Sequence, residues 1–200
     1  MIVIENLEER VGRWAVAEYA EASRVARERG VELVVSGYVT GELEAAMGRR
    51  GVRVMRDAAR VLNRPDVILL DLWAPKTLGP EEALTARAFV VGGILGDHPP
   101  RGRTMLLYDS YSSAARRNLG PYQLSVDGAV KVLLQVLEGK RVSEIPLVSP
   151  LRLNIEALTR AEVVLPFAYP VREGKPWISE ELVELLRRGL TWEEAISLAP

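Results

Sequence analysis

The chain has 200 residues, of which 48% are hydrophobic and 26% are charged, enough for a sizeable core in one domain or in one domain with an extension. It has no cysteine and a single histidine, His98, which excludes disulfides, thiolate metal sites, cysteine nucleophiles and His-rich metal sites. A formal net charge of −1, no run near about 20 apolar residues and no N-terminal signal pattern predict a cytoplasmic protein without an overall attraction for nucleic acid or membrane.

The first 140 residues alternate between strand and helix patterns. In chain order we expect a strand at 1–4, a helix at 8–29, a strand at 31–36, a helix at 40–50, a strand at 52–55, a helical turn at 56–62 and a strand at 66–71. Strands at 88–91 and 114–119 follow, and then a helix at 125–139 with one apolar stripe. Apolar strands that alternate with helices predict an α/β fold with a parallel sheet.

The composition changes after Lys140, where five prolines divide the chain into short pieces. Alternating leucines and isoleucine predict an exposed strand at 151–155, and two helices are expected at 179–189 and 191–198. We therefore expect residues 1–140 to form the main domain and residues 141–200 an extension packed on it.

A glycine-rich loop follows the apolar strand at 88–91. Gly92, Gly93 and Gly96 allow a ligand to come close to the backbone, and Pro99 and Pro100 stiffen the end of the loop. In α/β proteins such a loop commonly holds a ligand. The alternative is a tight turn that binds nothing.

Acidic and basic residues beside this loop have two interpretations each. Asp97 can contact a cationic group or simply bond its own turn, and His98 can act as a base or be structural. Arg103 can bind a carboxylate or remain solvated. The acids of the first helix, Glu5, Glu8 and Glu9, either complement the helix dipole or form an acidic lip for a basic peptide.

Four segments together carry a resemblance to one family. They are residues 5–9 with 14–19, the run Gly-Gly-Ile-Leu-Gly-Asp-His-Pro-Pro at 92–100, residues 117–120 with Gln123, and residues 165–169 with 173–176. In this order the chain resembles the small SPOUT-class methyltransferases often labelled SAM-dependent RNA methyltransferase. That family includes the fungal enzyme that methylates an arginine of a small-subunit ribosomal protein.

The resemblance implies an α/β fold with a parallel sheet, helices on both faces and a deep C-terminal trefoil knot, together with S-adenosylmethionine as cofactor and no metal. It implies cofactor binding by Leu70, Pro75, Gly92, Gly93, Gly96, Asp97, His98, Leu119, Gly120, Gln123 and Leu124. For a methyltransferase of this kind, the chemistry of the side chains predicts catalytic roles for Asp97, Glu8 and Arg103, and substrate binding by Glu5, Glu9 and Tyr169.

Three functions follow from these residues. The first is methylation of an arginine in a basic protein such as a ribosomal protein, since carboxylates can orient a guanidinium and accept its proton. The second is methylation of rRNA or tRNA, which would need a basic track for phosphates. The third is a catalytically silent cofactor-binding module. The oligomeric state, a monomer or a homodimer across the knot, stays open.

Overall fold

The computed structural model describes residues 1–94, 96, 99–155 and 161–189. Its centre is a six-stranded, wholly parallel sheet in the order β3-β2-β1-β5-β4-β6. The strands are β1 (Ile2–Asn6), β2 (Leu33–Gly37), β3 (Arg53–Val54), β4 (Val67–Leu70), β5 (Ala88–Gly93) and β6 (Ala115–Arg117). The predicted parallel α/β sheet is confirmed.

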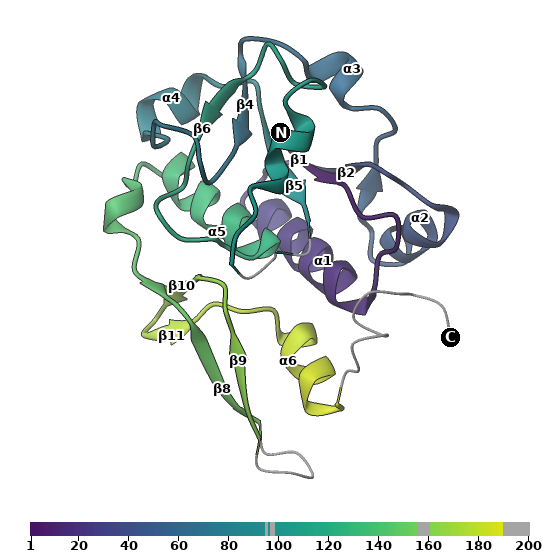
Figure 1. Ribbon diagram of the computed structural model, residues 1–200, viewed down its shortest axis with the longest axis vertical. Helices are drawn as coiled ribbons and strands as arrows, with labels where there is room; N and C mark the ends of the chain where they lie inside the picture. The colour runs from purple at the N-terminus through teal and green to yellow at the C-terminus, as the bar shows by residue number, and fades with distance from the viewer. Residues whose placement is uncertain (95, 97–98, 156–160, 190–200) are drawn as a thin grey trace.

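Both faces of the sheet are covered because its central strands are apolar on both sides. Ile2 and Ile4 of β1 face the layer that contains α1 (Arg13–Glu28), α2 (Gly41–Gly48), α4 (Pro80–Thr85) and α5 (Val126–Leu137). Val3 faces the other layer, with α3 (Ala59–Leu62), the 3₁₀ helix η1 (Arg103–Leu107) and Tyr111. Figure 1 shows α1 and α5 side by side next to the sheet.

Helix caps agree with two of the expected starts and correct a third. Thr40 accepts a hydrogen bond from the Leu43 amide at 3.1 Å, and Ser125 accepts one from the Gly128 amide at 3.1 Å. The expected start of the first helix at residue 8 is wrong, because Gly12 is extended and α1 begins at Arg13. Glu8 and Glu9 therefore precede the helix, and Glu5 lies in β1, so none of the three complements the helix dipole.

The C-terminal part packs as small antiparallel sheets. β7 (Leu147–Val148), β10 (Tyr169–Arg172) and β11 (Lys175–Pro176) form one sheet, and β8 (Leu151–Ile155) with β9 (Ala161–Leu165) forms a hairpin that projects from the body (Figure 1). The strand at 151–155 is thus confirmed, as is a helix near 179–189, observed as α6 (Glu180–Arg187). The expected helix at 191–198 lies outside the described residues. Within the described part of the chain, every helix is too short or too polar to cross a bilayer.

A buried lysine joins the C-terminal strands to the helical layer. Lys131 of α5 is fully buried, and its Nζ lies 2.7 Å from Asp127 Oδ2 and 3.2 Å from Glu21 Oε1. Its third partner is the Trp177 carbonyl oxygen at 2.9 Å. The Trp177 ring also has the Arg29 and Arg172 guanidinium groups within 5.1 and 5.0 Å of its centroid. The residues after β11 are therefore anchored on α1 and α5.

A buried carboxyl group connects α1 to the start of α5. Glu18 accepts hydrogen bonds from Trp14 Nε1 at 2.8 Å and from the Val126 amide at 3.1 Å. Loss of solvation, with a smaller contribution from the nearby Asp127 carboxylate, raises the pKa of Glu18 to about 8. The folded protein therefore favours the protonated form of Glu18 at neutral pH.

This pKa predicts how stability depends on pH. An unfolded glutamate loses its proton near pH 4.5, whereas Glu18 in the fold keeps it to about pH 8, so the Glu18 contribution to stability falls as the pH rises through that range. We expect the free energy of unfolding, measured with urea from pH 5 to 8.5, to fall more steeply for the native chain than for Glu18→Gln. The difference between the two slopes isolates Glu18 from other titrating groups, and equal slopes would contradict the prediction.

Candidate active site

A cavity opens where β4 and β5 end, beside the N-terminus of α5. Three loops surround it: the loop after β4, the loop after β5 and the segment between β6 and α5. In open parallel α/β sheets ligands bind at the carboxyl ends of the strands. The cavity therefore lies where the topology predicts a ligand site.

The loop after β4 contributes Leu70, Asp71 and Leu72 to the cavity wall. The Asp71 carboxylate is buried and accepts hydrogen bonds from the Trp73 amide at 3.2 Å and from the Tyr108 hydroxyl at 2.5 Å. Arg116 lies over the Tyr108 ring, 4.2 Å from its centroid. The sequence analysis does not predict Asp71 as a site residue. Its position at the carboxyl end of an apolar strand could have indicated it, because ligands bind at that edge of a parallel sheet.

The loop after β5 forms the opposite wall with Gly92, Ile94, Gly96 and residues 100–104. Gly102 has a left-handed backbone with φ of 64°, which glycine adopts without strain. A Cβ atom on Gly102 would lie 2.1 Å from the Trp73 ring. The loop after β5 is therefore packed directly on the loop after β4.

The third segment and the start of α5 close the cavity with mainly apolar residues. The segment contributes Leu119, Gly120, Tyr122, Gln123, Leu124 and Ser125, and α5 contributes Val126 and Ala129. The segment touches the loop after β5 closely, because a Cβ atom on Gly96 would lie 2.5 Å from Gln123 Nε2. The Gln123 carbonyl accepts a hydrogen bond from the Ala168 amide at 2.8 Å. All three loops are thus in contact, and the C-terminal part supports the third.

An ion pair lies at the rim of the cavity. Arg103 Nη1, on a residue that lines the cavity, is 2.8 Å from Glu8 Oε1. The two side chains are 30% and 19% exposed, so solvent and a large ligand can both reach them. This pair joins the segment after β1 to the loop after β5.

The structure brings most of the predicted cofactor residues into this one cavity, with Leu70, Gly92, Gly96, Leu119, Gly120, Gln123 and Leu124 in its lining. Two others lie elsewhere. Pro75 is exposed beyond the loop after β4, and Gly93 faces the protein interior, where a Cβ atom would lie 2.5 Å from the Tyr19 hydroxyl. Asp97 and His98 lie outside the described residues.

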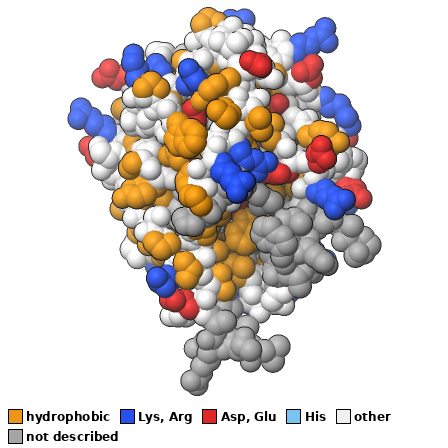
Figure 2. All heavy atoms as spheres, viewed as in Figure 1, with side chains coloured by type: hydrophobic (Ala, Val, Ile, Leu, Met, Phe, Trp, Pro, Cys, Tyr) orange, Lys and Arg blue, Asp and Glu red, His pale blue; other side chains and the backbone are white. Residues whose placement is uncertain are grey.

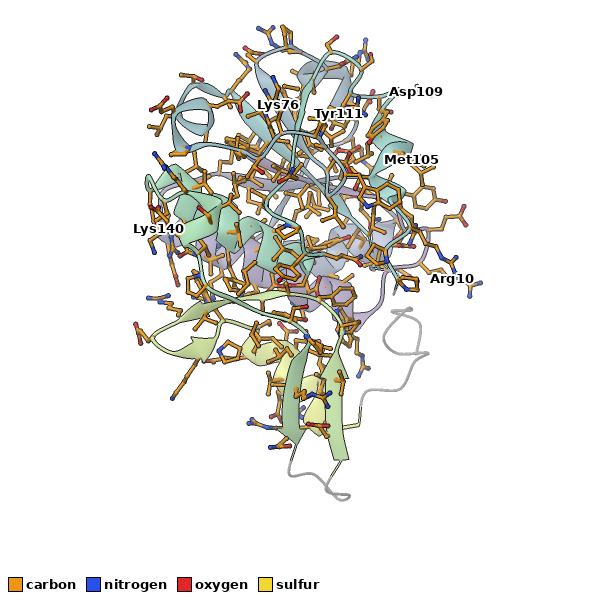
Figure 3. The ribbon with its side chains drawn as sticks, turned by 60° about the vertical axis from the view of Figure 1, so that its left-hand side comes forward. Arg10, Lys76, Met105, Asp109, Tyr111 and Lys140 are labelled. Atoms are coloured by element: carbon orange, nitrogen blue, oxygen red, sulfur yellow. The ribbon has the colours of Figure 1, made fainter. Side chains whose placement is uncertain are left out.

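The predicted substrate residues are spread over three environments. Glu5 is buried on the other face of the sheet, where Tyr111 donates a hydrogen bond to its Oε2 at 2.9 Å and burial raises the pKa of Glu5. Figure 3 shows Tyr111 inward of Met105 and Asp109. Glu9 is exposed, and Tyr169 is fully buried, so a ligand does not reach the Tyr169 ring in this structure.

Large apolar side chains are exposed around the cavity. Trp73 and Tyr122 are 55% and 52% exposed, and Met105 and Leu106, which follow the lining residue Thr104, are 53% and 63% exposed. Figure 2 shows apolar side chains gathered over the middle and upper part of one face, with cations among them.

Comparison with known proteins decides the family. The family model described as "Protein arginine N-methyltransferase SFM1-like" matches residues 1–193. The chain is 31% identical over 206 aligned residues to protein arginine N-methyltransferase SFM1 of Saccharomyces cerevisiae, covering 93% of each chain. This protein belongs to the SFM1-like family.

Solved structures agree with this assignment. The structure of yeast SFM1 in complex with SAM superposes with a TM-score of 0.81 at 27% identity and covers 94% of this chain and 89% of that one. A dual-specific Trm10 from Thermococcus kodakaraensis superposes with a TM-score of 0.55 at 17% identity, covering 72% of this chain and 95% of the other. The second likeness concerns the fold alone. The SPOUT-class resemblance and its α/β fold are confirmed.

The contact between Gly102 and Trp73 provides a test of the cavity in this SFM1-like protein. We expect Gly102→Ala to weaken binding of S-adenosylmethionine at least about tenfold, because the left-handed backbone and the Trp73 ring both oppose a Cβ atom. Isothermal titration calorimetry measures the affinity. Gly41→Ala is the matched control, since a Cβ atom there meets nothing within 4 Å. Equal affinities for both variants would contradict the prediction.

Proposed function

We propose that this protein transfers a methyl group from S-adenosylmethionine to an arginine guanidinium of a basic protein, with a ribosomal protein as the expected class of substrate. The observation that carries the proposal is the Glu8–Arg103 ion pair at the rim of a cavity built by three loops at the ends of β4, β5 and β6. A carboxylate in that position is able to hold a guanidinium. The family and its yeast relatives support the same reaction.

The lining of the cavity fits S-adenosylmethionine. Leu119, Leu124 and Val126 offer apolar surface for an adenine ring, and Gly96 and Gly120 line the same cavity. Arg101 and Arg103 offer guanidinium groups for a carboxylate. When bound, the cofactor supplies a methyl group on a positively charged sulfur.

We assign to Glu8 the role of binding the guanidinium of the substrate arginine. Arginine keeps its proton in water, since its pKa is above about 12, so methylation requires a nitrogen that loses a proton as it forms the new N–C bond while the S–C bond breaks. The Glu8 carboxylate accepts N–H bonds, orients the planar guanidinium and receives the proton. Asp97, in the same loop as Gly96, remains a second candidate for this role.

We also propose that the chain forms a trefoil knot and divides into a main domain and an extension. The likeness of this chain to yeast SFM1 over 94% of its length supports the trefoil knot that the SPOUT-class resemblance implies, in the region of the loop after β5 and the segment before α5. The anchoring of Trp177 on Lys131 supports an extension, residues 141–200, packed on a main domain of residues 1–140.

A labelled-methyl assay tests the function. The protein is incubated with S-adenosylmethionine that carries a labelled methyl group and with cell lysate, and the product is treated with protease or with nuclease. We expect the label to be released by protease and to appear as methylarginine after acid hydrolysis. Label released by nuclease would indicate an RNA methyltransferase instead, and cofactor binding without any labelled product would indicate a silent binding module.

The role of Glu8 gives a second test. We expect Glu8→Gln to fold normally and to lower the rate of methyl transfer about 10²-fold or more, because the amide neither accepts a proton nor carries the charge that attracts a guanidinium. The initial rate in the labelling assay and thermal unfolding measure the two effects. Glu42→Gln, an exposed acid in the first turn of α2, is the control. A variant with full activity would remove Glu8 from the mechanism.

A further inference from the structure

The last residue of β1 uses its whole hydrogen-bonding capacity. Asn6 is fully buried, and its Nδ2 donates to the Glu8 carbonyl at 2.9 Å and to the Tyr38 carbonyl at 2.7 Å. Its Oδ1 accepts from the Tyr19 hydroxyl at 2.9 Å and from the Glu8 amide at 3.4 Å. A side-chain amide has two donors and two acceptor lone pairs, so all four are occupied.

The strands on both sides of Asn6 make room for this arrangement. Asn6 is paired with Gly37 of β2 and with Gly93 of β5. A Cβ atom on Gly37 would lie 2.3 Å from the Asn6 carbonyl oxygen, and one on Gly93 would lie 2.5 Å from the Tyr19 hydroxyl. The absence of a side chain at Gly93 therefore leaves room for the Tyr19 hydroxyl beside Asn6, and its absence at Gly37 leaves room for the Asn6 backbone.

The arrangement fixes the chain direction after β1. Asn6 holds both the amide and the carbonyl of Glu8, and the Glu8 side chain then reaches Arg103 at 2.8 Å. Tyr19, which comes from α1 and is 1% exposed, orients the Asn6 amide in turn. A path of direct contacts thus runs from the helical layer to the cavity rim.

We propose that Asn6 and Tyr19 are positioning residues that hold Glu8 against Arg103 at the rim of the cavity. The inference rests on the function proposed above, since that function gives Glu8 its role. Methyl transfer is an in-line displacement, and a misplacement of about 1 Å can lower the rate about 10²-fold. Asn6 and Tyr19 therefore act on the reaction through Glu8 and touch neither substrate nor cofactor.

Two variants separate positioning from general stability. Tyr19→Phe removes one hydroxyl and keeps the ring, and Asn6→Asp removes the two donors to the Glu8 and Tyr38 carbonyls. We expect each variant to lower the initial rate of methyl transfer about tenfold at saturating cofactor, while the cofactor dissociation constant changes less than about twofold. Thr40→Ala, which removes the cap of α2, is a control that loses stability without touching Glu8.

A double-mutant cycle shows whether Tyr19 acts through Glu8. If it does, Tyr19→Phe lowers the rate of methyl transfer no further in a Glu8→Gln background. If the two residues act independently, their separate fold-decreases in rate multiply. Multiplying effects, or a Tyr19→Phe variant with the full rate, would overturn the inference and leave the proposed function intact. A Glu8→Gln variant with the full rate would overturn both the catalytic role of Glu8 and the positioning role of Asn6 and Tyr19.

Crystal structures give a readout that does not depend on activity. We expect the 2.8 Å contact between Glu8 and Arg103 to be lost in Asn6→Asp and kept in Thr40→Ala. An unchanged contact in Asn6→Asp would overturn the inference even if the native chain methylated no acceptor at all. A native chain that methylated no acceptor would reject the proposed function, whatever the crystal structures showed.

Discussion

The cavity depends on close contact between three loops through backbone that carries no side chain. Gly102 lies against the Trp73 ring on one side, and Gly96 lies against Gln123 on the other. A Cβ atom at either position would meet these side chains at 2.1–2.5 Å, so any other residue would require them to shift. The same three loops supply most of the cavity walls, and the loop after β5 leads directly to Arg103, which pairs with Glu8.

The helical layer supports the same site through buried polar groups. Glu18 of α1 holds the Val126 amide at the start of α5, and Val126 itself lines the cavity. Asn6 of β1 performs a similar task, since its Oδ1 accepts a hydrogen bond from the Tyr19 hydroxyl of α1. A buried polar group is unfavourable unless it is hydrogen-bonded, so these contacts hold one geometry. The position of α1 is thereby linked to both the third loop and the cavity rim.

Much of the fold could be predicted because buried helices and strands space their apolar residues in a recognisable pattern. Continuous apolar runs marked β4 and β5 as strands buried on both faces, and Thr40 and Ser125 marked the starts of α2 and α5. The short α4 was missed, since only six residues give too little periodicity. The start of α1 was misjudged because Glu8 and Glu9 suit a first helical turn equally well, and only the extended backbone of Gly12 excludes it.

The sequence could predict which loops form the site. It could not predict which way the individual residues of those loops and strands face. Glycine spacing identified the loop after β5, but only the sheet shows that Gly92 faces the cavity while Gly93 faces Tyr19. The same alternation sends Glu5 and Asn6 of β1 to opposite faces. Which face holds the ligand depends on the crossover connections, and those depend on contacts between residues far apart in the chain.

The anchoring of Trp177 has a consequence for the contact between α1 and α5. The Lys131 ammonium sits in the interior of the molecule, and one of its three oxygen partners is a main-chain carbonyl beyond β11. Deleting that tail would remove this carbonyl and the Trp177 ring that lies 5.2 Å from the ammonium, and it would leave Lys131 with the Asp127 and Glu21 carboxylates. Without the tail, the buried ion cluster around Lys131 would become a solvated surface ion pair, which contributes much less to holding α1 and α5 together.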